Sequence, residues 1–165
     1  MKYFLDNEFM EKPCTIDLIS IGIVSEIGKK FYAINKDCDL SQASKWVINN
    51  VLKSMPQYDY KNNCWRKDFD IFLMNKEDIK KGIIDFIGNE TPEFWAYYAD
   101  YDWVVFCWLF GSMIDLPKKF PMYCRDLKQE LDRLNIKELP IKQTNEHNAL
   151  SDAMWVKECY EYINK

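Results

Sequence analysis

The sequence contains little of what a structural zinc site or a disulfide scaffold requires. It has a single histidine, His147, and its six cysteines include no Cys-x-x-Cys pair. Structural zinc sites combine cysteine and histidine at close spacing, so the sequence argues against one. Six cysteines spread over 165 residues also do not resemble a secreted disulfide framework. We therefore interpret them as reduced, mostly core cysteines of a cytoplasmic protein.

Three further absences narrow the function. The opening stretch MKYFLDNEF lacks the layout of a signal peptide. The longest apolar run, residues 103–110, is too short to span a membrane. A formal net charge of −4 and a pI of about 5.1 argue against a broad basic surface that coats nucleic acid. A protein that binds the end of a nucleic acid through metal ions held by carboxylates remains compatible with this charge, because the carboxylates would themselves lower it.

The composition and the order of patterns predict one folded α/β domain over residues 1–165. Hydrophobic residues make up 48% and aromatic residues 16%, which is typical of an ordered core. We expect strands at residues 2–9, 14–26, 31–35, 93–99 and 120–126. We expect helices at residues 41–55, 76–87, 101–110 and 126–134, and from residue 147 onward. Residues 56–70 show no clean period and are expected to be irregular.

The expected helices have capping residues, which are Ser41, Asn75 and Asp126 for the first, second and fourth. An irregularity in strand pairing is expected near Ile19 and Ser20. Three consecutive strands joined by short turns predict an antiparallel start. The strand–helix crossovers that follow predict a mixed sheet with helices on both faces.

Two carboxylates occupy alternate positions on the first expected strand. Asp6 and Glu8 are two residues apart, so both side chains point to the same face. Neighbouring carboxylates repel each other unless a cation lies between them. The alternative is that both are solvated acids at a strand end.

A third carboxylate, Asp102, lies on the apolar face of an expected helix. Its neighbours three, four and seven residues on are Val105, Phe106 and Leu109. An ionised carboxylate on a buried face is costly unless it is paired or metal-bound. The alternative is that Asp102, or the nearby Asp100, caps the helix.

The stretch HNALSDA, residues 147–153, places a fourth carboxylate in a similar position. Asp152 shares a helical face with Ala149, Val156 and Cys159. On a continuous helix, His147 would lie about 140° away from Asp152. His147 must therefore lie in the preceding loop or the first turn if it faces the same site. The alternative is a surface histidine near a helix N-terminus.

Four acids and one imidazole are the groups that two-metal phosphodiester hydrolysis uses. The segments DNEF, ADYDWVVF and HNALSDA occur in the order of the three motifs of the DEDD superfamily. Over nearly its whole length the chain resembles the histidine-containing subgroup of these 3′–5′ exonucleases, which have a ribonuclease-H-like fold. The stretches WAYYADYDWVVFCWLFG and DLKQELD are similar to the small exoribonucleases of a mycobacterial-type family.

The second motif departs from the superfamily pattern in two ways. It has Tyr98 and Ala99 where ribonuclease T relatives often have His-Asn, and it offers both Asp100 and Asp102. In the superfamily motif an aromatic residue directly precedes the aspartate. This is true of Asp102 and not of Asp100, so the motif selects Asp102.

The resemblance implies a metal-dependent 3′–5′ exonuclease that acts on the 3′ end of a nucleic acid, RNA rather than DNA, and releases nucleoside 5′-monophosphates. Two Mg²⁺ or Mn²⁺ ions would be bound by four acids, which are Asp6, Glu8, Asp102 and Asp152. His147 would be the general base. Phe9 is expected either to stack on the terminal base or to lie in the core.

Two other functions remain open from the sequence. A proofreading-type DNA exonuclease would use the same chemistry on another substrate. A non-catalytic nucleic-acid-binding module would keep only the fold, but the complete acid set argues against it. A homodimer is compatible with the sequence.

Overall fold

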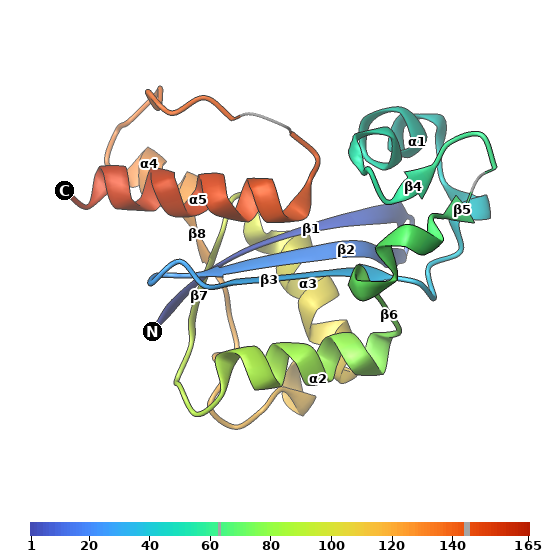
Figure 1. Ribbon diagram of the computed structural model, residues 1–165. Coiled ribbons are helices and arrows are strands. Elements are labelled where there is room, and N and C mark those ends of the chain that lie inside the picture. The colour runs from blue at the N-terminus through green and yellow to red at the C-terminus, as the bar shows by residue number, and fades with distance from the viewer. Residues whose placement is uncertain (63, 144–145) are drawn as a thin grey trace.

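The chain is built around a six-stranded mixed sheet with the strand order β6-β3-β2-β1-β7-β8 (Figure 1). The computed structural model describes residues 1–62, 64–143 and 146–165, without the side chains of Lys67, Phe69 and Asp70. The strands are β1 (Lys2–Lys12), β2 (Thr15–Ser25), β3 (Lys30–Asn35), β6 (Leu73–Met74), β7 (Glu93–Ala96) and β8 (Arg125–Asp126). The first three are antiparallel, whereas β7 is parallel to β1 and β8 is parallel to β7. This confirms the expected antiparallel start followed by parallel strands.

Helices cover both faces of this sheet, as expected (Figure 1). They are α2 (Lys76–Ile87) and α3 (Ala99–Phe110) on one face, and α4 (Leu127–Arg133) and α5 (Ala149–Ile163) on the other. The alternation of β1 explains the two layers, because successive side chains point to opposite faces. Tyr3 and Leu5 pack with α2 and α3, whereas Phe4 packs with α4 and α5.

The expected irregularity in β2 is a β-bulge beside Glu8. Glu8 pairs with Ser20 and Phe9 pairs with Leu18, so Ile19 has no partner on β1. A bulge adds one residue to a strand and changes the direction of the side chains beyond it. Here the bulge follows Glu8 directly, so the regular side-chain alternation that includes Asp6 and Glu8 ends at this point.

The prediction of one continuous helix over residues 41–55 is wrong. The segment consists of three short pieces, η1 (Leu40–Gln42), α1 (Lys45–Asn50) and η2 (Leu52–Ser54). The cap is Ser44 rather than Ser41, and its Oγ accepts a hydrogen bond from the Val47 N–H at 3.2 Å. Asparagine and β-branched residues hold α-helix weakly, and Asn49, Asn50 and Val51 stand where α1 ends.

The boundaries around the third helix also differ from expectation. β7 ends at Ala96 rather than residue 99, and α3 begins two residues early, because Asp126 accepts hydrogen bonds from the N–H groups of Tyr98 and Ala99. The strand expected at residues 120–126 is reduced to β8, and Pro121 offers no N–H for a longer ladder. The last helix begins at Ala149, with Asn148 as its cap, close to the expected start near residue 147.

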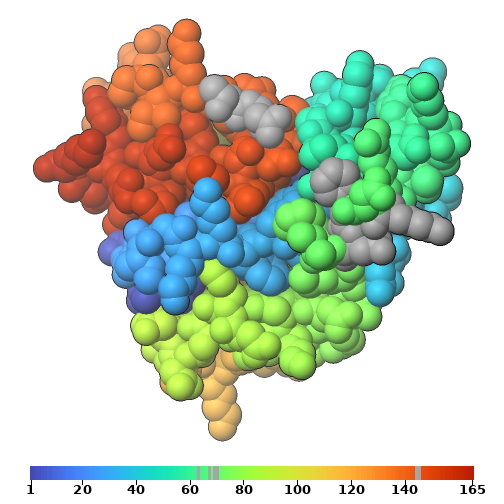
Figure 2. Space-filling model, in the orientation of Figure 1, coloured from blue at the N-terminus to red at the C-terminus, as the bar shows by residue number. Residues whose placement is uncertain are grey.

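The expected irregular connection contains a small antiparallel pair and a 3₁₀ segment. These are β4 (Tyr58–Asp59), β5 (Cys64–Trp65) and η3 (Lys67–Phe72), and a further 3₁₀ turn, η4 (Met113–Asp115), follows α3. Asn63, which belongs to this connection, lies outside the described residues. In the space-filling view, residues 40–62 (teal to green) form a shoulder beside the C-terminal part of the chain (orange to red) (Figure 2). Within the described ranges, the helices are too short or too polar to cross a membrane.

Candidate active site

A cleft of about 520 Å³ opens where β1, α1, α3 and the N-terminal end of α5 meet. The four acids singled out in the sequence line it, and so does the only histidine. Aromatic side chains form much of the remaining wall, and they are Phe9, Trp46, Tyr97, Tyr98 and Tyr101. The topology therefore gathers residues from both ends of the chain at one site.

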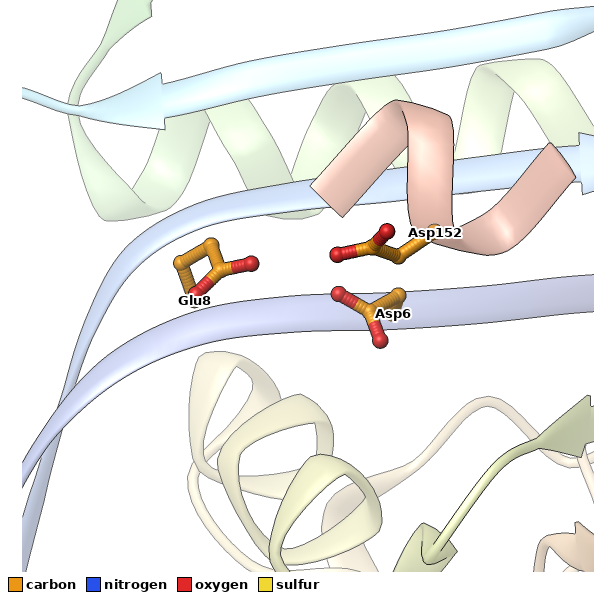
Figure 3. Close-up of side chains that lie close together, drawn as sticks. All are labelled: Asp6, Glu8 and Asp152. Atoms are coloured by element: carbon orange, nitrogen blue, oxygen red, sulfur yellow. The ribbon is translucent and has the colours of Figure 1, made fainter. Parts of the chain in front are cut away.

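Three of the carboxylates form a tight group. Asp6, Glu8 and Asp152 each offer a carboxylate oxygen, and these oxygens lie within 4.8 Å of one another. Figure 3 shows Asp152 reaching from α5 toward Asp6, with Glu8 farther along β1. The period of two along a strand places Asp6 and Glu8 on the face that α5 covers. An all-oxygen group of this size suits a hard divalent cation.

A glycine allows α5 to come this close to the sheet. Gly22 on β2 pairs with Asp6 on β1. A Cβ at Gly22 would lie 2.3 Å from the carbonyl oxygen of Ala149, in the first turn of α5. The α5 backbone therefore rests directly on β2, and Asp152 follows three residues later beside Asp6. The sequence signal for this contact is an isolated glycine within a strand, which marks a close backbone approach.

Asp102 enters the cleft from α3, on the other side of β1. It is 6% exposed, and its Oδ1 accepts a hydrogen bond from the Asn7 N–H at 2.8 Å. It lies outside the group of three, but its charge, after burial, is the next cause that raises the pKa of Asp6. Asp100, by contrast, is exposed and is absent from the described lining of the cleft. The placement favours Asp102 as the functional residue of the second motif.

His147 lies in the loop that precedes α5, off the helix, as the angular argument requires. Its backbone is left-handed, with φ of 63°, and its carbonyl accepts a hydrogen bond from Ser54 Oγ at 2.9 Å. Its ring packs edge-to-face on Trp46, with centroids 5.1 Å apart. These contacts hold the imidazole at the wall of the cleft.

Asp152 is oriented by groups that precede it in the chain. Gln143 Nε2 donates a hydrogen bond to its Oδ1 at 2.7 Å, and the Asn148 N–H donates to its Oδ2 at 3.2 Å. Sequence reasoning missed Gln143, because no motif or spacing marks a glutamine in a loop nine residues before its partner. Hydrogen-bonded partners of this kind orient metal-binding carboxylates.

Burial raises the pKa of all four motif acids in the cleft. The pKa of Glu8 rises to about 8, first through burial and then through the charges of Asp152 and Asp102. The pKa of Asp102 rises to about 7 through burial, against the opposing hydrogen bonds from Asn7. Burial also raises the pKa of Asp6 and of Asp152. Acids held this close favour the proton-bound form unless a cation offsets their charge, so the group fits a divalent metal site.

The predicted base-stacking residue, Phe9, also lies at the cleft. It is partly buried, and its ring centroid is 6.1 Å from that of Tyr101. Tyr101 and Trp46 remain 48% and 57% exposed, on two different helices. Phe9 thus belongs both to the edge of the core and to the wall of the cleft.

Comparison with solved structures places the fold in a known class. A structure of exonuclease I superposes with a TM-score of 0.66 at 12% sequence identity, covering 99% of this chain and 40% of that protein. This likeness confirms the ribonuclease-H-like fold.

Sequence comparison then gives the family. The chain belongs to the 3′-5′ exoribonuclease Rv2179c-like domain family, whose model matches residues 1–164. It is 37% identical over 153 residues to 3′-5′ exoribonuclease Rv2179c of Mycobacterium tuberculosis strain ATCC 25618 / H37Rv, covering 93% of this chain and 87% of that protein. The same values hold for 3′-5′ exoribonuclease MT2234.1 of strain CDC 1551 / Oshkosh. The resemblance drawn from the three motifs is thereby confirmed.

Proposed function

We propose that this cleft hydrolyses the last phosphodiester bond at the 3′ end of RNA and releases nucleoside 5′-monophosphates. One observation carries the proposal. Four buried or partly buried carboxylates and the only histidine line a single cleft, in a chain that belongs to a 3′-5′ exoribonuclease family. Because Asp6 and Asp152 come from opposite ends of the chain, we also propose that residues 1–165 act as one catalytic domain.

The four acids would hold two Mg²⁺ or Mn²⁺ ions. Asp6, Glu8 and Asp152 supply clustered oxygens, and Asp102 supplies the fourth carboxylate from across β1. When bound, the two ions would stabilise the attacking and leaving oxygens of the phosphodiester. The raised pKa values mean that the acids must release protons to bind cations, so cation affinity should rise with pH.

His147 would be the general base. A ring nitrogen of the imidazole would accept the proton of the attacking water, as histidine does in many hydrolases. The edge-to-face contact with Trp46 and the hydrogen bond at its carbonyl limit the positions of the ring. His147 is thereby held at the cleft without being part of the carboxylate group.

The aromatic wall would hold the terminal nucleotide. Phe9 and Tyr101 lie on the β1 and α3 side, and Trp46 lies on α1. Bases stack on aromatic side chains without strong sequence preference, which suits an enzyme that shortens a strand one nucleotide at a time. RNA is favoured over DNA because the relatives are named exoribonucleases.

A labelled-ladder assay tests this function. RNA and DNA of one sequence, labelled at either end, are incubated with Mg²⁺, Mn²⁺ or EDTA. We expect 5′-labelled RNA to shorten stepwise, 3′-labelled RNA to release its label at once as a mononucleotide, and EDTA to abolish both. The Asp152→Asn variant, purified in parallel, controls for contaminating nucleases.

Other outcomes would identify the alternatives. Faster shortening of DNA would indicate a proofreading-type exonuclease. Binding without degradation under every metal condition would indicate a non-catalytic module and would overturn the proposal.

A further inference from the structure

The helix that carries Asp102 has no side-chain cap of its own. Tyr98 occupies the N-cap position of α3 with a left-handed backbone, φ 57°, and makes no side-chain capping hydrogen bond. The N–H groups of a first turn need acceptors from elsewhere, or the turn frays. Asp102 lies in this first turn. What holds the turn therefore decides where Asp102 stands.

One contact comes from β1. β7 pairs with β1 only as far as Phe4, so the N–H of Asn7 lies beyond the paired stretch. It donates to Asp102 Oδ1 at 2.8 Å, while Asn7 Nδ2 donates to the backbone oxygen of Asp102 at 3.0 Å. Asn7 is 5% exposed, so little water competes for these bonds. Both the carboxylate and the backbone of Asp102 are thus tied to the residue that follows Asp6.

The other contact comes from the end of β8. Asp126 Oδ2 accepts a hydrogen bond from the Ala99 N–H at 3.2 Å, and its Oδ1 accepts from the Tyr98 N–H at 3.3 Å. The same Oδ1 accepts from the Lys128 N–H at 2.7 Å, which caps α4. A carboxylate at the N-terminal end of a helix also interacts favourably with the helix dipole. Asp126 therefore supplies α3 with the acceptor that Tyr98 lacks.

We infer that Asn7 and Asp126 are positioning residues that form an α3 clamp and hold Asp102 at a fixed place relative to Asp6. The inference rests on the proposed function, in which Asp102 binds a metal ion. Asn7 Oδ1 has no hydrogen-bond partner among the described residues, so the amide contributes through its donor group. The residue between the two motif acids thus has a task of its own, which is to join β1 to the helix that carries the next acid.

Matched variants test the clamp. Asn7→Ala removes the Nδ2 hydrogen bond to the backbone oxygen of Asp102 and leaves the backbone N–H that donates to Asp102 Oδ1. Asp126→Asn keeps the side-chain shape but replaces one acceptor with a donor. As controls, Asn75→Ala removes the side-chain cap of α2, and Asp39→Asn makes the same acid-to-amide change at the cap of η1. Neither residue is among the described lining of the cleft. Mn²⁺ affinity is measured on the metal-free protein by electron paramagnetic resonance, beside the melting temperature and kcat.

We expect both clamp variants to lose about 10–100-fold in Mn²⁺ affinity or in kcat, as is typical when a residue that orients a metal ligand is changed. The controls should lower the melting temperature about as much as the clamp variants do, but they should keep the parental Mn²⁺ affinity. In an Asp102→Asn background, where turnover is expected to be lost, Asn7→Ala should cause no further loss of Mn²⁺ affinity, because its effect passes through Asp102.

Two results would overturn the clamp while the proposed function stands. One is parental Mn²⁺ affinity and kcat in both clamp variants. The other is a loss of Mn²⁺ affinity from Asn7→Ala that is as large in the Asp102→Asn background as in the parent. A parent protein that binds no Mn²⁺ would instead refute the proposed metal site, and the clamp with it.

Discussion

Replacing Gly22 with alanine should push the first turn of α5 away from β2 and lower the activity of the site, although none of its acids is changed. The new Cβ would lie 2.3 Å from the Ala149 carbonyl oxygen, 2.4 Å from its carbonyl carbon and 2.5 Å from the Leu150 nitrogen. All three are backbone atoms, so no side-chain rotation relieves the contact. The first turn of α5 must move, and Asp152 moves with it.

The required displacement sets the size of the effect. Ordinary van der Waals contact begins near 3.4 Å, so the Ala149 backbone must retreat by roughly 1 Å. A misplacement of about 1 Å can reduce an enzymatic rate by about 10²-fold. Overpacking of this kind costs about 1–3 kcal/mol of unfolding free energy. For a chain of this length, each 1 kcal/mol lowers the melting temperature by about 2–4 °C.

The assay compares Gly22→Ala with Gly82→Ala, a glycine on α2 whose added Cβ would lie 2.7 Å from Phe31 Cε2. That contact is with a side chain on the opposite face of the sheet and away from the cleft. Calorimetry gives the melting temperatures, and single-turnover hydrolysis of labelled RNA with a Mn²⁺ titration gives activity and affinity. Gly22→Ala should lose activity and Mn²⁺ affinity at temperatures where it is folded, whereas Gly82→Ala should keep both, because its contact is with the end of a side chain that can move. Parental activity and Mn²⁺ affinity in folded Gly22→Ala would refute the reasoning.

Three further predictions concern single groups in the cleft. Asp102→Asn should abolish turnover and Asp100→Asn should leave most of it in steady-state assays; the reverse would mean that the motif is misaligned by two residues. His147→Ala should lower kcat by about 10²–10⁴-fold with Mn²⁺ affinity kept, whereas Asp152→Ala should weaken both. Near-parental rates for His147→Ala from about pH 6 to about pH 9 would exclude it as the base. Because folding raises the pKa of Glu8 from 4.5 to about 8, it favours the protonated acid, and the metal-free protein should lose stability as the pH rises through that interval. Mn²⁺ should therefore raise the melting temperature more at the upper end of this pH interval than at the lower end. An equal shift at both ends would contradict the link between cation binding and loss of the Glu8 proton.

Features set by near neighbours could be predicted from the sequence. The helix over residues 76–87 has the predicted bounds, because Asn75 caps its start and Gly88 ends it with a positive φ. Asp6 and Glu8 share a face because the period of a strand is two. Where two caps compete, the same approach is less accurate. Ser41 and Ser44 both precede apolar positions, and the periodicity that follows does not decide between them.

The motif acids were also visible before the fold. Asp102 and Asp152 occupy apolar helical faces, which made them anomalous as surface residues, and the structure finds both buried. The angular argument also placed His147 off the last helix, because five residues turn a helix too far for the two side chains to coincide. These conclusions depend on local geometry and on the cost of burying a charge, both of which a sequence specifies directly.

Only the tertiary structure decided how these groups meet. The contact of Asn7 with Asp102 joins residues 95 apart, and that of Ser54 with His147 joins residues 93 apart. The hydrogen bond from Gln143 to Asp152, the support of α3 by Asp126 and the fit of α5 against Gly22 were likewise not predicted. Contacts of this kind depend on how the elements pack and on where β7 ends, which no local pattern records. The sequence by itself therefore determined which residues are proposed to carry the chemistry and which face of each element they occupy. The distances between them, and the residues that hold them there, come from the packing of distant segments, because that packing forms only when the whole sheet and its helices are assembled.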